Sequence, residues 1–186
     1  MSTTLSRKFK FLEEIGTLPV LVSTGLQFLG VKEIPGAQSN PVILQMAKSL
    51  GIEKIYTNDD TSWCGLFMSY LFFLTGKPFP DLKGDQYNYL RAAWFLGYGN
   101  EVQKGSEMLG DVCIFKRPGG NHVGLIIAES EKTFFVLGGN QSNSVNIAEI
   151  SKSRLLQCRR LYRTSVPSSV KKYTLSTTGT VSTNEA

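Results

Sequence analysis

The sequence has a single histidine, three cysteines and no Cys-x-x-Cys pair. Structural zinc sites need about four closely spaced cysteine or histidine ligands, so we expect no such site. The three cysteines, Cys64, Cys113 and Cys158, cannot all pair with one another. Cys113 and Cys158 fall in strand-like runs, and we expect both to be small buried apolar residues. This cysteine usage suits a reducing compartment.

Long hydrophobic runs are also missing. The most apolar stretch, residues 64–74, is shorter than the roughly 20 residues of a membrane-spanning helix, so we expect a buried core helix there and no transmembrane segment. The basic N-terminus leads into apolar residues 15–29, but Glu13 and Glu14 interrupt the transition. We therefore expect an ordinary helix rather than a signal peptide.

No run of the chain alternates basic and aromatic residues, so we expect no nucleic-acid partner. The 20 lysines and arginines outnumber the 15 acidic residues, which gives a formal net charge of +5 and a pI near 9.1. This moderate excess suits attraction to a polyanion such as a bacterial wall, without selecting one.

The 186 residues, 41% of them hydrophobic, are enough for one globular domain with a real core. Residues 1–16 are polar and charged and are interpreted as an N-terminal arm, and residues 17–163 as the folded domain. Residues 164–186 are rich in serine and threonine and lack periodicity, so we expect a flexible tail.

Helical patterns precede strand patterns along the chain, which predicts an α+β fold with an antiparallel meander. The expected helices cover residues 17–30, 40–50, 64–74 and 86–96, and the second has Asn40 as its cap and Pro41 at its first position. The expected strands are Val112–Lys116, His122–Ala128, Thr133–Leu137, Val145–Ala148 and Leu155–Tyr162.

Cys64 stands at the start of the apolar helix, after Asp60, Thr61 and Ser62, which all suit an N-cap. The unpaired N–H groups and the dipole of a helix start favour a thiolate, the nucleophilic form of cysteine. Taken alone, however, the position fits a buried structural cysteine better than a nucleophile.

His122 is the one candidate base for a cysteine nucleophile, and it opens a strand-like run after a Pro-Gly-Gly turn. A third polar group should orient the imidazole. Asn140 follows the next strand, and its carbonyl oxygen is the candidate acceptor for the Nδ1–H of His122. Taken singly, His122 fits a strand-end histidine and Asn140 a turn residue in the left-handed region.

In this order, the motifs resemble the CHAP group (cysteine, histidine-dependent amidohydrolase/peptidase) of papain-like peptidoglycan hydrolases, and within it a subgroup from phage lysins and bacterial wall enzymes. The likeness covers residues 17–163. Its motifs are Trp63-Cys64, Gly110-Asp111-Val112, His122-Val123-Gly124 and Leu137-Gly-Gly-Asn-Gln141, with weaker segments at 33–41 and 91–97.

The resemblance implies a papain-like α+β fold, with N-terminal helices and the nucleophile on a buried helix packed against the antiparallel sheet. It implies that Cys64 is the nucleophile, that His122 acts as base and then acid, and that Asn140 orients it. Trp63, Trp94 and Gln141 are the candidate substrate-binding residues, although packing is favoured for Trp63. The implied reaction is cleavage of an amide bond in peptidoglycan by an amidase or endopeptidase.

The sequence departs from the family pattern at two positions. Many CHAP enzymes have a glutamate two residues before the asparagine, where this chain has Gly138, and the subgroup usually has glycine where Asn121 stands. Some CHAP domains bind calcium through a carboxylate-rich loop, but the acids of residues 31–62 are scattered. We therefore predict no required metal and no cofactor.

Two other functions stay open. One is a non-catalytic protein that keeps this fold to bind wall fragments or to assemble into a virion with other virion proteins. The other is a papain-like protease acting on proteins. As a free lysin the protein is expected to be monomeric, made in the host cytoplasm and released to the cell wall; the alternative is a virion-associated hydrolase.

Overall fold

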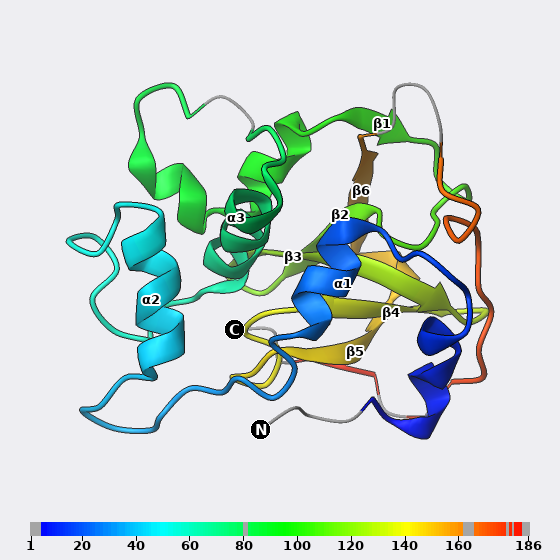
Figure 1. Ribbon diagram of the computed structural model, residues 1–186, viewed down its shortest axis with the longest axis horizontal. Helices are drawn as coiled ribbons and strands as arrows, with labels where there is room; N and C mark the ends of the chain where they lie inside the picture. The colour runs from blue at the N-terminus through cyan, green and yellow to red at the C-terminus, as the bar shows by residue number, and fades with distance from the viewer. Residues whose placement is uncertain (1–4, 80–81, 162–165, 178, 180, 184–186) are drawn as a thin grey trace.

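The computed structural model describes residues 5–79, 82–161, 166–177, 179 and 181–183. Apart from the short helix between the last two strands, the helical elements precede the strands, which gives a mixed α+β fold (Figure 1). The helical elements are η1 (Arg7–Glu13), α1 (Val20–Leu26), α2 (Pro41–Ser49), α3 (Cys64–Thr75), η2 (Gln86–Leu90), η3 (Ala92–Gly97) and η4 (Lys152–Arg154). The strands are β1 (Asn100–Val102), β2 (Val112–Arg117), β3 (Gly120–Glu129), β4 (Thr133–Gly138), β5 (Asn146–Ser151) and β6 (Leu155–Arg160).

The strands form one antiparallel sheet in the order β1-β6-β2-β3-β4-β5. Strands β2 to β5 form the expected meander, but β6 returns to the other side of β2, and β1 was not predicted. At the β2–β3 turn, Pro118 is followed by Gly119 with φ +76°, which brings Arg117 opposite Gly120. Proline followed by a positive-φ glycine is the pattern of a type II turn.

Helix α3 lies against one face of the sheet, with α1 beside it (Figure 1). Its side chains from Cys64 to Ser69 are all buried. The helix ends at Gly76, whose φ of +61° lets Lys77 N–H reach the carbonyl of Phe72 at 3.0 Å. The predicted cap is wrong: the N-cap residue is Trp63, and its side chain makes no capping hydrogen bond.

Cys113 and Cys158 are directly opposite on β2 and β6 and form a disulfide, which corrects the expectation of two unpaired buried cysteines. They belong to a small apolar cluster on the sheet face away from α3, together with residues such as Phe115 and Val136. Both the strands and the burial of each cysteine were expected. Which strands are neighbours was not, and β6 beside β2 is what brings the two sulfurs together.

Described segments near both ends of the chain pack on the domain. In η1, Phe9 and Leu12 are buried, so the residues interpreted as an arm join the core. At the other end, the backbone of Glu129 at the end of β3 bonds Tyr173 and Leu175, both at 2.8 Å. Residues 166–177 thus lie on the domain instead of forming the separate tail that the composition suggested.

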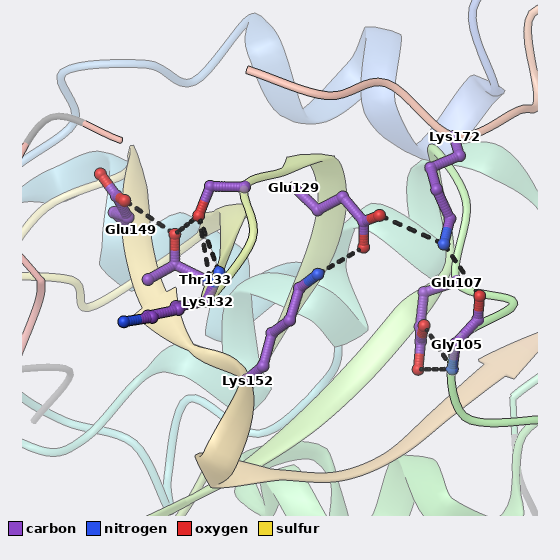
Figure 2. A network of polar contacts seen from close by, with 9 residues as sticks. Gly105, Glu107, Glu129, Lys132, Thr133, Glu149, Lys152 and Lys172 are labelled. Carbon is purple, nitrogen blue, oxygen red and sulfur yellow. Dashed lines mark hydrogen bonds and ion pairs between the residues drawn. The ribbon is translucent and has the colours of Figure 1, made fainter. Parts of the chain in front are cut away.

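Charged side chains reinforce this attachment (Figure 2). The carboxylate of Glu129 contacts Lys152 at 2.9 Å and Lys172 at 3.1 Å, and Lys172 also donates to the carbonyl of Gly105 at 2.8 Å. One carboxylate therefore connects η4, the C-terminal segment and, through Lys172, the loop before β2.

The helix predicted over residues 86–96 is instead two short 3₁₀ helices, η2 and η3, separated at Arg91. Asp85 caps η2, accepting from Tyr87 N–H at 2.9 Å. Within η3, Ala93 is exposed. Among all described residues, no helix is long and apolar enough to cross a membrane.

Candidate functional site

Cys64 is the first residue of α3, and its side chain is 2% exposed. Its Sγ lies 4.0 Å from the carbonyl oxygen of Asn121 and accepts from the backbone N–H of Val123. The thiol therefore contacts the backbone on both sides of His122. Gly65 permits this position, because a Cβ there would lie 2.3 Å from the carbonyl oxygen of Leu90 in η2.

Burial raises the pKa of the Cys64 thiol above its ordinary value, which corrects the expectation that the helix start yields a thiolate. Weaker influences act in the opposite direction: the backbone N–H of Val123, the charge of Arg117, the N–H of Gly65 and the hydroxyl of Ser62 each lower the pKa. The group is thus a neutral thiol at neutral pH, next to donors and a cation that would stabilise its anion.

His122 lies near the start of β3 and is fully buried. Its Nε2 is 3.0 Å from Oε1 of Gln141. The amide nitrogen of Gln141 is occupied as a donor, to Val136 O at 3.1 Å and to Asn146 O at 2.8 Å, so its oxygen faces the ring as an acceptor. Since a carbonyl oxygen only accepts, Nε2 carries the hydrogen, and in the neutral ring the lone pair is on Nδ1.

Asn140 does not make the contact expected of it. It is buried with φ +58°, and its Nδ2 points to Ser62 Oγ at 3.4 Å, while its Oδ1 has no hydrogen-bond partner among the described residues. The left-handed turn at Asn140 sends its side chain toward the segment before α3 and that of Gln141 toward β3. The amide that contacts the His122 ring is therefore that of Gln141, which was expected to bind substrate.

Two glycines make room for this arrangement. A Cβ at Gly138 would lie 3.1 Å from His122 Nε2 and 3.0 Å from Gln141 Oε1, so a side chain there would crowd the bond between them. A Cβ at Gly139 would lie 2.6 Å from Cβ of Phe67 in α3. Gly138, where the resembling family often has glutamate, leaves the space that Gln141 fills.

Arg117 was not singled out from the sequence, and Ser62 was named there only as a possible helix cap. At the end of β2, Arg117 donates through Nε to Asn121 O at 3.1 Å and through an Nη nitrogen to Ser62 Oγ at 2.8 Å. Because Ser62 Oγ accepts from both Arg117 and Asn140, its own hydrogen is available to the Cys64 sulfur. The sequence did hold a signal for Arg117: it directly precedes the Pro-Gly turn of the hairpin whose second strand carries the candidate histidine.

The two tryptophans that were candidates for substrate binding differ in burial. Trp63 is fully buried and donates to Glu33 at 2.6 Å, so it packs the core, as favoured from the sequence, and does not line a groove in this conformation. Trp94 is half-buried and stacks on Phe79, with ring centroids 5.8 Å apart. Trp94 belongs to η3, which follows η2, and the backbone of η2 lies against Gly65, the residue after Cys64. Trp94 therefore stays a candidate for substrate contact.

The acids before α3 support the loop and do not form a metal centre. Asp59 is 1% exposed, and its Oδ2 accepts the backbone N–H groups of Ile34 at 3.1 Å and Asn40 at 2.7 Å. Burial raises the pKa of Glu33, with Asp59 and Asp60 adding to the shift. Within the described residues, no three histidine, cysteine or acidic side chains are grouped so that they could hold a metal ion.

No protein-family model, no curated protein and no solved structure matches the chain.

Proposed function

We propose that this protein is a cysteine-dependent amidohydrolase of papain-like fold that cleaves an amide bond of bacterial peptidoglycan. The single observation that supports the chemistry is the hydrogen bond between His122 Nε2 and Gln141 Oε1. His122 belongs to β3, and the start of this strand contacts the Cys64 thiol. The choice of peptidoglycan rests on the CHAP resemblance, which also suggests a phage lysin or a virion-associated wall hydrolase.

The first step is proton transfer. With its hydrogen on Nε2, neutral His122 has Nδ1 as its basic nitrogen, and Nδ1 takes the proton of Cys64 as the sulfur attacks the amide carbonyl. Burial raises the pKa of the Cys64 thiol, which favours a transfer in which His122 removes the proton as the sulfur attacks. Gln141 then holds the imidazolium, since its oxygen accepts from Nε2 in either charge state.

The later steps return the site to its starting state. The carbonyl oxygen gains negative charge and is met by the Cys64 backbone N–H, which is unpaired at a helix start, and by a donor from the preceding loop. His122 protonates the departing amine as the C–N bond breaks and a thioester forms. Water, losing a proton to His122, then cleaves the thioester, which regenerates the thiol and releases the carboxylate.

The test is digestion of purified peptidoglycan by the wild type, Cys64→Ala and Cys64→Ser, with mass spectrometry of the released fragments. We expect new amine termini with the wild type alone, and their masses identify the bond. If Cys64→Ala releases as much as the wild type, the hydrolase proposal is wrong.

One observation favours a second candidate, a non-catalytic protein that binds wall fragments or assembles into a particle. Cys64 is 2% exposed and His122 fully buried, so the pair is closed to a polymer in this conformation. Sedimentation of the protein with insoluble peptidoglycan distinguishes the two: tight binding without any released fragment supports the second candidate. Cleavage of casein but not of peptidoglycan would instead indicate a protease.

A further inference from the structure

Arg117 lies between the segment that precedes Cys64 and the segment that precedes His122. It ends β2 just before the Pro118-Gly119 turn, and in the ladder it faces Gly120, the residue before Asn121. The hairpin therefore carries Arg117 on one strand and His122 on the other. Arg117 is half-buried, whereas Lys116 beside it is exposed.

The guanidinium connects the segments that precede Cys64 and His122. Ser62, bonded at 2.8 Å, is two residues before Cys64, and Asn121, bonded at 3.1 Å, is the residue before His122. A planar guanidinium has donors in fixed directions, so it can hold two acceptors at once, which an ammonium does less well. One side chain thus sets the spacing between the start of α3 and the start of β3.

The charge of Arg117 also acts on the thiol. The segments around Cys64 bring His122 from β3, Arg117 from β2, and the acids Asp59 and Asp60 from the loop before α3. The acids raise the pKa of Glu33, while Arg117 is the charged side chain that lowers the pKa of Cys64. A cation near a buried sulfur offsets part of the cost of ionising it.

We propose that Arg117 is a positioning residue of the reaction: it holds Ser62 and Asn121 together and stabilises the Cys64 thiolate as it forms. This inference rests on the hydrolase proposed above for its use in catalysis. The expected motifs did not include it, and a purely structural arginine would contribute to stability alone.

The experiment uses the fact that Cys64 is the only cysteine outside the disulfide. Without reductant, ionisation of this thiol is followed between pH 6 and 11 by thiolate absorbance near 240 nm, with Cys64→Ala as the blank. The rate of iodoacetamide labelling is measured in parallel. Absorbance needs no reagent access, so burial of the thiol does not prevent the measurement.

We expect the ionisation midpoint of Arg117→Met to rise by about one pH unit above that of the wild type. Arg117→Lys, which keeps the charge, should stay closer to the wild type. The matched control is Arg154→Met: Arg154 donates to the carbonyl of Lys116 in the same strand at 2.8 Å, but it is not among the groups that shift the pKa of Cys64, so its midpoint should not move. Ser62→Ala keeps the charge and removes one anchor, which should lower peptidoglycan cleavage with a smaller shift of the midpoint.

An unchanged midpoint in folded Arg117→Met overturns the proposal, as does an equal shift in Arg154→Met. If Arg117→Met does not fold, Arg117→Gln and Arg117→Lys decide: a midpoint equal to the wild type in the neutral Gln variant is the overturning result. Failure of the hydrolase proposal is seen separately, as a wild type that shows the expected midpoint but releases no wall fragments.

Discussion

The two ends of β3 carry polar networks of opposite character. At its start, His122 and the neighbouring Cys64 are buried, and the buried oxygen Oδ1 of Asn140 has no hydrogen-bond partner in the described part of the chain. At its far end, Glu129 pairs with two lysines whose side chains are 29% and 41% exposed (Figure 2). One network is buried and incomplete; the other is paired and partly in water.

The difference indicates what each network is for. Ion pairs with partly exposed side chains contribute roughly 0–1 kcal/mol, so the Glu129 network serves to fasten the C-terminal segment. A buried acceptor without a partner costs about 1–3 kcal/mol, which a fold does not retain for stability. The start of β3 is therefore the place to look for function, and the following predictions test this contrast.

The largest effect is expected at the start of β3. Cys64→Ala and His122→Ala should each lower peptidoglycan cleavage by about 10³-fold or more, because each removes the nucleophile or its base. The measurement is the rate of fragment release. Thermal unfolding provides the control: the small change in side-chain volume in Cys64→Ala should leave the melting temperature nearly unchanged. Residual cleavage within tenfold of the wild type would contradict both roles.

The next effect distinguishes Gln141 from Asn140. Gln141→Ala should lower cleavage by about 10²-fold, because His122 loses the acceptor that places the hydrogen on Nε2. Asn140→Ala should cost clearly less, since its amide contacts Ser62 at the long distance of 3.4 Å. Fragment release by both variants, corrected for their folded fractions, is the comparison. A larger loss in Asn140→Ala would restore the role first expected of that residue.

The disulfide on the opposite face of the sheet should affect stability and leave the chemistry intact. Replacing Cys113 and Cys158 together by alanine removes a link across 45 residues and should lower the free energy of unfolding by about 2–4 kcal/mol. Urea unfolding measures it. Cleavage at low temperature should equal that of the wild type, because both cysteines belong to the apolar cluster on the sheet face away from α3, the helix that carries Cys64. A loss of cleavage without a loss of stability would refute this separation.

Local rules predicted much of this fold. Asn40 caps α2 through Val42 N–H at 2.8 Å, with Pro41 as the next residue, because capping depends on neighbours in the chain. The long apolar helix was also expected, and so were four of the five strands predicted to form a meander, since burial periodicity and turn residues are local signals.

The sequence-based predictions that were wrong concerned features that depend on contacts between residues far apart in the chain. Nothing near Cys113 or Cys158 indicates that β6 returns beside β2 and pairs them. Composition alone predicted a flexible tail over residues 164–186, but backbone bonds from Glu129 to Tyr173 and Leu175, which need no particular side chain, attach part of it. Asn140 and Gln141 are adjacent amides, and only the left-handed backbone at Asn140 determines which of them reaches His122.

The smallest effect is expected at the far end of β3. Glu129→Gln removes the charge shared by Lys152 and Lys172 but keeps the backbone bonds to Tyr173 and Leu175, so unfolding free energy should fall by less than about 1 kcal/mol, and less still at high salt. Urea unfolding at two salt concentrations measures this, and the Cys64 ionisation midpoint should not move, since the two sites are at opposite ends of the strand. A shift of that midpoint would mean that the two ends are coupled, and the contrast between a buried functional network and an exposed fastening would then fail.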